Sequence, residues 1–191
     1  MRVGLFFGSF DPIHVGHLAI ANYMADHTGL DEVWLVVSPH NPLKEKNSLL
    51  NENERLHLVN MALDHHKKIK ASDIEFKLPK PSYTIDTLRY LAEKFPQNEF
   101  CLIMGSDNLG SFDKWKNYEE ILKHYKILVY PRPDKKGSQF DEHPAVTFVD
   151  APLMDISATF IRRSIKEKKD VRSLLHPKVW EYIDTKNFYK N

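Results

Sequence analysis

The chain has 191 residues, of which 42% are hydrophobic and 28% are charged, and this composition predicts a single globular domain over residues 1–191. Because 27 Lys and Arg residues balance 26 Asp and Glu residues, the formal net charge of +1 does not favour nucleic-acid binding, and any anion site must be local. No apolar run is long enough for a membrane span, and the first is too short for a signal peptide, so we expect a cytoplasmic protein with no membrane partner.

Apolar runs rich in β-branched and aromatic residues alternate with helical patterns up to about residue 150. Strands are predicted at 2–7, 32–38, 69–73, 99–104, 125–131 and 145–149, and helices at 17–27, 52–66, 84–95 and 118–124. This alternation predicts an α/β fold for residues 1–150, with a Rossmann-like, mostly parallel sheet that has helices on both faces. Residues 151–191 are predicted to form a loop and two or three helices that pack back on the sheet.

The only cysteine, Cys101, lies in the apolar run "FCLIM" within the fourth predicted strand. A single cysteine cannot form an intramolecular disulfide or a thiolate metal cluster. In such a run a thiol is usually buried, so we expect Cys101 to be an inert core residue and not a nucleophile.

The stretch "GSFDPIHVGH", residues 8–17, lies where the first predicted strand meets the first helix. It matches neither the G-x-G-x-x-G dinucleotide fingerprint nor the G-x-x-x-x-G-K-[ST] P-loop. The position still favours phosphate binding, because N–H groups at a helix start attract anions and imidazoles add donors. His14 and His17 can face the same side of the turn, and Gly16 lets a base or phosphate approach the backbone. Incidental surface histidines are the alternative interpretation.

Two motifs near opposite ends of the sequence resemble those of the nucleotidyltransferases. "GSFDPIHVGH" is similar to their G-x-F-D-P-x-H-x-G-H signature, and "ISATFIRRSI", residues 156–165, is similar to I-S-S-T-x-I-R. Ser157 suits a helix N-cap, and Arg162 can direct a fork of donors at phosphate oxygens. Members of this family transfer a nucleotidyl group from a nucleoside triphosphate to a phosphate and release pyrophosphate.

Three segments between these motifs resemble the nicotinate-mononucleotide adenylyltransferases. "SPHNPLK" is similar to their P-x-x-x-P-P-H-K loop, with Lys44 at the phosphate-facing lysine and Leu43 where a histidine is usual. "PSYTIDTL", residues 81–88, resembles the family's carboxylate-binding segment before the third helix. "MGSDNLGSFDKWKNYEEIL", residues 104–122, resembles its G-x-D-x-L…W stretch.

The resemblance implies three overlapping sets of site residues. Catalytic roles fall on His14, His17, Lys44 and Arg162. ATP would contact Gly8, Ser9, Phe10, His14, Gly16, His17, Gly105, Asp107, Ile156, Ser157, Thr159 and Arg162. Nicotinate mononucleotide would contact Lys44, Tyr83, Thr84, Asp107 and Trp115.

Several of these residues also have plainer interpretations. Trp115 could be a core aromatic, but its polar neighbours favour a stacking platform for a ring. Asp107 follows the fourth strand directly, at an edge where a carboxylate can bind ribose hydroxyls. Asp11, which precedes Pro12, could be ordinary turn chemistry.

The resemblance implies that the 5′-phosphate of nicotinate mononucleotide attacks the α-phosphorus of ATP, giving deamido-NAD and pyrophosphate in NAD biosynthesis. No protein nucleophile is required, since such transfers depend mainly on positioning and charge stabilisation. Mg²⁺ is expected with ATP, held by phosphates and water, so no protein metal ligand is predicted. The alternatives are a phosphopantetheine adenylyltransferase and a non-catalytic nucleotide sensor on the same fold. The sequence leaves open whether the chain forms a homo-oligomer.

Overall fold

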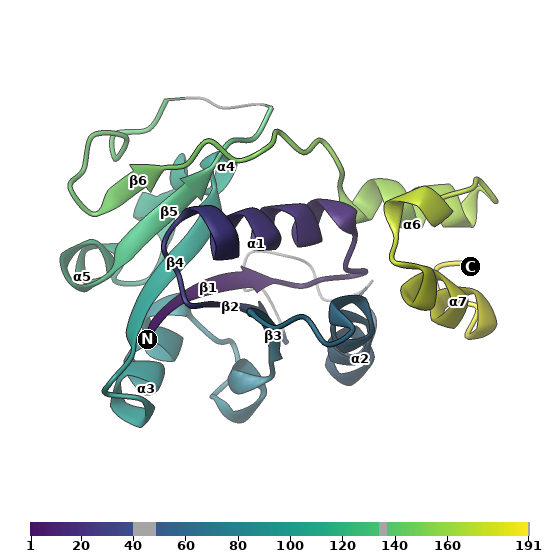
Figure 1. Ribbon diagram of the computed structural model, residues 1–191, viewed down its shortest axis with the longest axis horizontal. Helices are drawn as coiled ribbons and strands as arrows, with labels where there is room; N and C mark the ends of the chain where they lie inside the picture. Colours follow the sequence, from purple (N-terminus) through teal and green to yellow (C-terminus); the bar gives the residue numbers. More distant parts are fainter. Residues whose placement is uncertain (40–48, 134–136, 191) are drawn as a thin grey trace.

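A six-stranded parallel sheet lies at the centre of the computed structural model, which describes residues 1–39, 49–133 and 137–190 (Figure 1). Its strands are β1 (Arg2–Gly8), β2 (Glu32–Val37), β3 (Ile69–Ser72), β4 (Glu99–Gly105), β5 (Lys126–Tyr130) and β6 (Val146–Phe148). They lie in the order β3-β2-β1-β4-β5-β6, and every neighbouring pair is parallel. The predicted Rossmann-like α/β fold is therefore confirmed, with each strand end within one residue of the predicted range.

Both faces of the sheet are covered, which explains why its central strands are continuous apolar runs. In β4, Cys101 and Ile103 face one hydrophobic core, whereas Phe100 and Leu102 face the other. Cys101 is fully buried, and burial raises the pKa of its thiol. The expectation of a buried thiol is confirmed, and a raised pKa disfavours the reactive thiolate.

Seven α-helices are found in the described ranges, and they divide between the two cores. The first core includes residues of α1 (Val15–His27), α2 (Glu52–Leu63), α6 (Ala158–Lys166) and α7 (Pro177–Thr185). The second includes residues of α3 (Thr84–Lys94), α4 (Ser106–Leu109) and α5 (Tyr118–His124). Short 3₁₀ helices occur at η2 (Ile74–Lys77), η3 (Phe112–Lys114) and η4 (Arg172–Leu174). In the parts of the chain that the structure describes, no helix has the length and apolarity that a membrane crossing requires.

Two predicted helices differ from the observed ones by more than one residue at an end, whereas α3 ends only one residue before its predicted end. The first begins at Val15 and not at residue 17, because His14 has extended backbone angles and is the N-cap. The second ends at Leu63, three residues before the predicted end, since Asp64 and His65 adopt positive φ angles of 34° and 68°. A left-handed residue of this kind terminates a helix.

The direction of the strand order reverses at β1, which has β2 on one side and β4 on the other. In open α/β sheets, ligands bind in the crevice outside the carboxyl ends of the strands at such a reversal. The chain leaves β1 at this edge and enters α1, so the fold places the sequence motif at residues 8–17 directly beside the crevice.

Candidate active site

Two cavities meet at the carboxyl end of β1, where Phe7, Gly8 and Ser9 line both of them. The α3 cavity, of about 430 Å³, extends from Ser82 at the start of α3 across to Trp115 after η3. The α6 cavity, of about 470 Å³, lies between the first turn of α1 and the residues that begin α6. Two ligands that occupied the two cavities would therefore meet over the end of β1.

The α6 cavity brings together segments that are about 140 residues apart in sequence. Eleven of the residues expected to contact ATP line it: Gly8, Ser9, Phe10, His14, Gly16, His17, Asp107, Ile156, Ser157, Thr159 and Arg162. Gly105, the twelfth, lines neither cavity. A Cβ atom at that position would lie 2.3 Å from Asp107 Oδ1, so Gly105 makes room for the Asp107 side chain.

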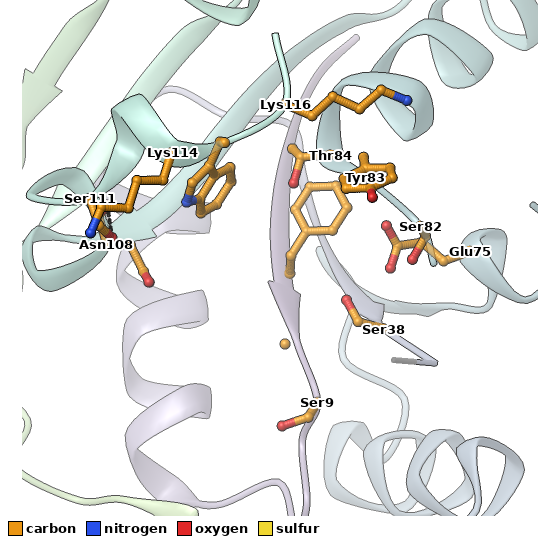
Figure 2. Close-up of a pocket in the computed structure, with 13 residues that line it drawn as sticks. Ser9, Ser38, Glu75, Ser82, Tyr83, Thr84, Asn108, Ser111, Lys114 and Lys116 are labelled. Carbon is orange, nitrogen blue, oxygen red and sulfur yellow. Dashed lines mark hydrogen bonds between the residues drawn. The ribbon is translucent and has the colours of Figure 1, made fainter. Parts of the chain in front are cut away.

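The α3 cavity holds Tyr83, Thr84 and Trp115 of the residues expected to contact nicotinate mononucleotide. Figure 2 shows Tyr83 and Thr84 on the opposite side of this cavity from Asn108 and Lys114. Asp107, expected to contact both substrates, lines only the α6 cavity. Lys44 lies outside the described residues.

His14 and His17 stack at the start of α1, with ring centroids 3.7 Å apart and an interplanar angle of 26°. A Cβ atom at Gly16 would lie 3.0 Å from His14 Nδ1, so glycine leaves space for the first ring. The His14 backbone N–H donates to His17 Nδ1 over 3.3 Å, and Phe10 packs edge-on against His17 at 5.0 Å. Because Nδ1 accepts, a neutral His17 carries its proton on Nε2.

His14 is nearly fully buried, at 4% exposed. Burial, with a smaller contribution from the nearby Arg132 guanidinium, lowers its pKa from 6.5 to about 4. At neutral pH the imidazole is therefore uncharged and can donate one hydrogen bond without bringing a positive charge.

The buried neutral His14 should make the protein less stable in acid. Because its folded-state pKa lies below the unfolded value of 6.5, the unfolded chain takes up the proton first as the pH falls. The free energy of unfolding should fall between pH 6.5 and pH 4, by roughly 3 kcal/mol from this residue. Urea denaturation at pH 7, 5.5 and 4 checks this, with His14→Asn as the non-titrating control. Equal losses in the two proteins would contradict it.

The start of α6 supplies the second half of the α6 cavity. Ser157 is the N-cap, and its Oγ accepts a hydrogen bond from the Phe160 N–H at 3.1 Å. Arg162, on the next turn, donates through Nη1 to the Asp11 carbonyl oxygen at 2.7 Å and through Nη2 to Thr159 Oγ1 at 3.3 Å. The side chain stays about a quarter exposed, so its donors can still face the cavity.

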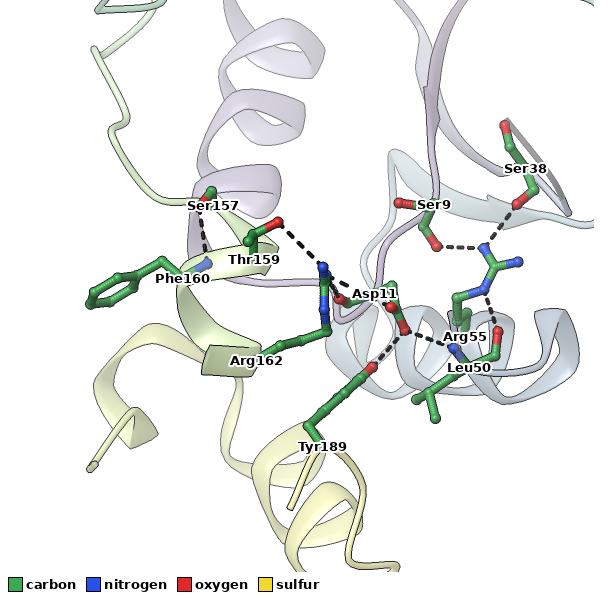
Figure 3. A network of polar contacts seen from close by, with 10 residues as sticks. All are labelled: Ser9, Asp11, Ser38, Leu50, Arg55, Ser157, Thr159, Phe160, Arg162 and Tyr189. Atoms are coloured by element: carbon green, nitrogen blue, oxygen red, sulfur yellow. Dashed lines mark hydrogen bonds and ion pairs between the residues drawn. The ribbon is translucent and has the colours of Figure 1, made fainter. Parts of the chain in front are cut away.

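Asp11 lies in the turn after β1, but it is also buried and connects four segments of the chain, so its role goes beyond turn chemistry (Figure 3). Its Oδ1 accepts hydrogen bonds from the Leu50 N–H at 3.2 Å and from Tyr189 Oη at 2.7 Å. Its Oδ2 lies 3.7 Å from Arg162 Nη1. The sequence gives no signal for this, since the Tyr189 partner is 178 positions away.

Arg55 is a second buried charged residue that the sequence did not single out. It lies on α2 with only 1% of its surface exposed. Its guanidinium donates to the carbonyl oxygens of Leu50, Ser9, Ser38 and Pro39 over 2.6–3.1 Å. These bonds hold the chain segments that follow β1 and β2 against α2. They therefore also hold in place Ser9, which lines both cavities.

Arg132 also belongs to the α6 cavity, although sequence reasoning missed it. Its Nη1 donates to the Met154 carbonyl oxygen at 2.8 Å, and its Nε lies 4.0 Å from Asp107 Oδ2. It follows β5 in a polar stretch of the sequence, where an arginine is usually solvated. Together with Arg162 it gives this cavity two guanidinium groups.

The α3 cavity is built on the first turn of α3. Tyr83 is the N-cap, with φ −118° and ψ 141°, so the N–H groups that follow lie at a helix start. Glu75 also lines this cavity, is 2% exposed and accepts a hydrogen bond from Thr87 Oγ1 at 2.8 Å. Burial raises the pKa of the Glu75 carboxyl.

Trp115, which follows η3, also lines this cavity and is only partly buried. Its ring packs at 5.3 Å against Phe112, which is fully buried in the second core. Lys116 extends over the Tyr83 ring at 4.5 Å and pairs with Asp86 at 2.8 Å. The Trp115 ring, which packs against the buried Phe112 at the wall of the cavity, can stack on a flat ligand.

Comparison with known proteins identifies the same family as the two motifs. The cytidylyltransferase-like family model matches residues 5–164. A relative from Flavobacterium psychrophilum, named "Probable nicotinate-nucleotide adenylyltransferase", is 57% identical over the full length of both chains. A relative of the same name from Cytophaga hutchinsonii is 55% identical, also over the full length of both.

A solved structure, described as Plasmodium falciparum nicotinic acid mononucleotide adenylyltransferase complexed with NaAD, has the same fold. It superimposes with a TM-score of 0.85 at 21% identity and covers 98% of this chain and 97% of that one. Both sequence motifs, the reversal of strand order at β1 and the full-length relatives agree. The chain therefore belongs to the cytidylyltransferase-like family and, within it, to the nicotinate-nucleotide adenylyltransferases.

Proposed function

We propose that this enzyme transfers AMP from ATP to nicotinate mononucleotide, giving deamido-NAD and pyrophosphate in NAD biosynthesis. The observation that carries the proposal is the pair of cavities that share Phe7, Gly8 and Ser9 at the end of β1. One cavity is lined by imidazole and guanidinium groups and the other by a helix start and an aromatic ring. This arrangement fits two nucleotides whose phosphates meet, as direct transfer requires.

ATP is assigned to the α6 cavity, with its phosphates between the start of α1 and the start of α6. His17 Nε2, the helix N–H groups and Arg162 would donate to phosphate oxygens and stabilise charge as pyrophosphate leaves. His14 would add a neutral donor, and Asp107 would bind ribose hydroxyls. The remaining residues expected to contact ATP line the same cavity: Gly8, Ser9, Phe10, Gly16, Ile156, Ser157 and Thr159.

Nicotinate mononucleotide is assigned to the α3 cavity. The N–H groups of Tyr83 and Thr84 would bind the ring carboxylate, and Trp115 would stack on the pyridine ring. Its 5′-phosphate would then attack the α-phosphorus of ATP over the end of β1. Lys44 keeps its proposed phosphate contact from the sequence alone, because it lies outside the described residues.

The residues that line the α6 cavity fit Mg²⁺ only as an ion that arrives with ATP. Asp107 is the one carboxylate among them, and no group of three or more His, Cys, Asp or Glu residues in the described ranges could hold a metal ion. Mg²⁺ commonly binds through substrate phosphates, water and one or two carboxylates, and when bound it neutralises charge on the phosphates. Because Asp107 is assigned to the ribose hydroxyls, the ATP phosphates and water would hold the ion.

Pyrophosphate release from ATP and Mg²⁺ tests the function with three reactions: nicotinate mononucleotide, phosphopantetheine and no acceptor. We expect turnover with nicotinate mononucleotide and only background rates in the other two. Turnover with phosphopantetheine alone would establish the rival adenylyltransferase, and background rates throughout would favour a nucleotide sensor. A cytoplasmic location and the lack of nucleic-acid partners stay predictions from the sequence.

A further inference from the structure

Tyr189 follows α7 in the sequence, and its hydroxyl hydrogen-bonds to the loop between β1 and α1. Tyr189 has a positive φ of 63°, and its Oη donates to Asp11 Oδ1 at 2.7 Å (Figure 3). Burial and the Asp11 charge both raise the pKa of Tyr189, so the phenol keeps its proton and always donates. A buried, charge-assisted hydrogen bond thus joins this segment to the loop between β1 and α1.

Asp11 offers Arg162 two acceptors that compete for one guanidinium. Its carbonyl oxygen receives Arg162 Nη1 at 2.7 Å, whereas its carboxylate Oδ2 lies 3.7 Å from the same nitrogen and accepts no hydrogen bond among the described residues. Two donors, Tyr189 Oη and the Leu50 N–H, share Oδ1. They satisfy part of the buried charge, which would otherwise attract Arg162 more strongly.

We propose that Tyr189 is a positioning residue for adenylyl transfer, which holds Asp11 so that Arg162 stays on the Asp11 carbonyl and directs its donors into the α6 cavity. Without the tyrosine hydroxyl, the under-bonded carboxylate would draw the guanidinium into a close ion pair. The donors that Arg162 directs at ATP phosphates would then move away from them. The proposal rests on the function proposed above only in placing ATP in the α6 cavity.

Tyr189→Phe removes this one hydroxyl, and the chain offers a matched control. Tyr182 belongs to the same aromatic cluster, and its Oη donates to a carboxylate oxygen of Glu54 at 3.0 Å, but it does not contact Asp11. Tyr182→Phe therefore deletes the same kind of bond elsewhere. Both variants are compared with the wild type for thermal midpoint, KM for each substrate, kcat, and the Kd of a non-hydrolysable ATP analogue with Mg²⁺.

Tyr189→Phe should raise the Kd of the ATP analogue and the KM for ATP by about 3- to 10-fold, the range expected for one hydrogen bond. The KM for nicotinate mononucleotide should stay within about twofold, and Tyr182→Phe should leave all of these values near wild type. In an Arg162→Lys background the effect of Tyr189→Phe should largely disappear, because the two residues act through one contact.

The proposal is overturned if Tyr189→Phe weakens ATP binding no more than Tyr182→Phe does. It is also overturned if the Tyr189 effect persists at full size beside Arg162→Lys, or if both KM values and kcat change together, as a general structural role would require. Because binding of the ATP analogue needs no acceptor, this result is independent of which mononucleotide the enzyme uses. Failure of the proposed function and failure of this inference are therefore distinguishable.

Discussion

Replacing His17 by alanine is expected to lower kcat about 10²- to 10³-fold, the usual loss for one donor to developing charge. His17 lies in the first turn of α1, where its Nδ1 is occupied by the His14 N–H and its Nε2 carries the proton. Charge grows on the leaving pyrophosphate during transfer, so this donor is worth more in the transition state than in the bound substrate. KM for ATP should therefore change much less than kcat.

Steady-state kinetics of the purified variant measure this effect. His27→Ala is the matched control, because His27 lies at the other end of the same helix, is exposed and stacks only on Tyr23 among the ring contacts in the described residues. Thermal midpoints of both variants show whether the fold is kept. A folded His17→Ala enzyme with turnover close to that of His27→Ala would contradict the assigned role.

Replacing Arg55 by methionine is expected to lower the free energy of unfolding by roughly 3–5 kcal/mol. The side chain is 1% exposed, and its guanidinium donates to four carbonyl oxygens of the segments that follow β1 and β2 and precede α2. Methionine fills much of the space but leaves these carbonyls without their donors. It also leaves the nearby charge of buried Asp11 less well compensated.

Urea denaturation followed by circular dichroism gives this free energy directly. Arg89→Met is the control, because Arg89 is exposed on α3 and its guanidinium forms a long ion pair of 4.0 Å with Glu120. Removing this exposed side chain should lower the free energy of unfolding by less than about 1 kcal/mol. A loss at Arg55 as small as that at Arg89 would contradict a structural role for the buried guanidinium. Since domains are stable by only about 5–15 kcal/mol, the expected loss is a large part of the total.

The fold was predictable because each β-strand is a local pattern. The central strands are apolar on both faces, and the strands alternate with helices, which together imply a parallel sheet. The ends of helices were predicted less accurately than those of strands. Asp64 and His65 end α2 by adopting left-handed backbone angles, and their residue types alone do not predict this. The short α4 at Ser106–Leu109 was missed for a similar reason, because four residues carry no periodicity.

The candidate site was predictable as far as its residues lie in contiguous motifs. His14, His17 and Arg162 line one cavity as the two motifs suggested. Arg55 and Tyr189 escaped notice because their roles depend on long-range burial: each is an ordinary polar residue in its own segment. Only the folded chain shows that they meet near Asp11.

Selectivity between mononucleotides follows from the same geometry. Nicotinate and nicotinamide mononucleotides differ by a carboxylate against a neutral amide, and the proposed partners of this group are the N–H donors at the start of α3. Such donors suit an anion, whereas an amide NH₂ would face them as a second donor. Because the preference resides in the backbone, it should partly survive removal of the stacking ring in Trp115→Ala, even as both acceptors bind more weakly.

The most direct test of the account is the ratio of kcat/KM for nicotinate mononucleotide to kcat/KM for nicotinamide mononucleotide, measured with the wild-type enzyme at saturating ATP and Mg²⁺. The assignment of the α3 cavity predicts a preference for nicotinate mononucleotide of at least about 100-fold, since a site built from donors strongly rejects a ligand that leaves them unpaired. Equal values for the two mononucleotides, or a preference for the amide, would contradict it.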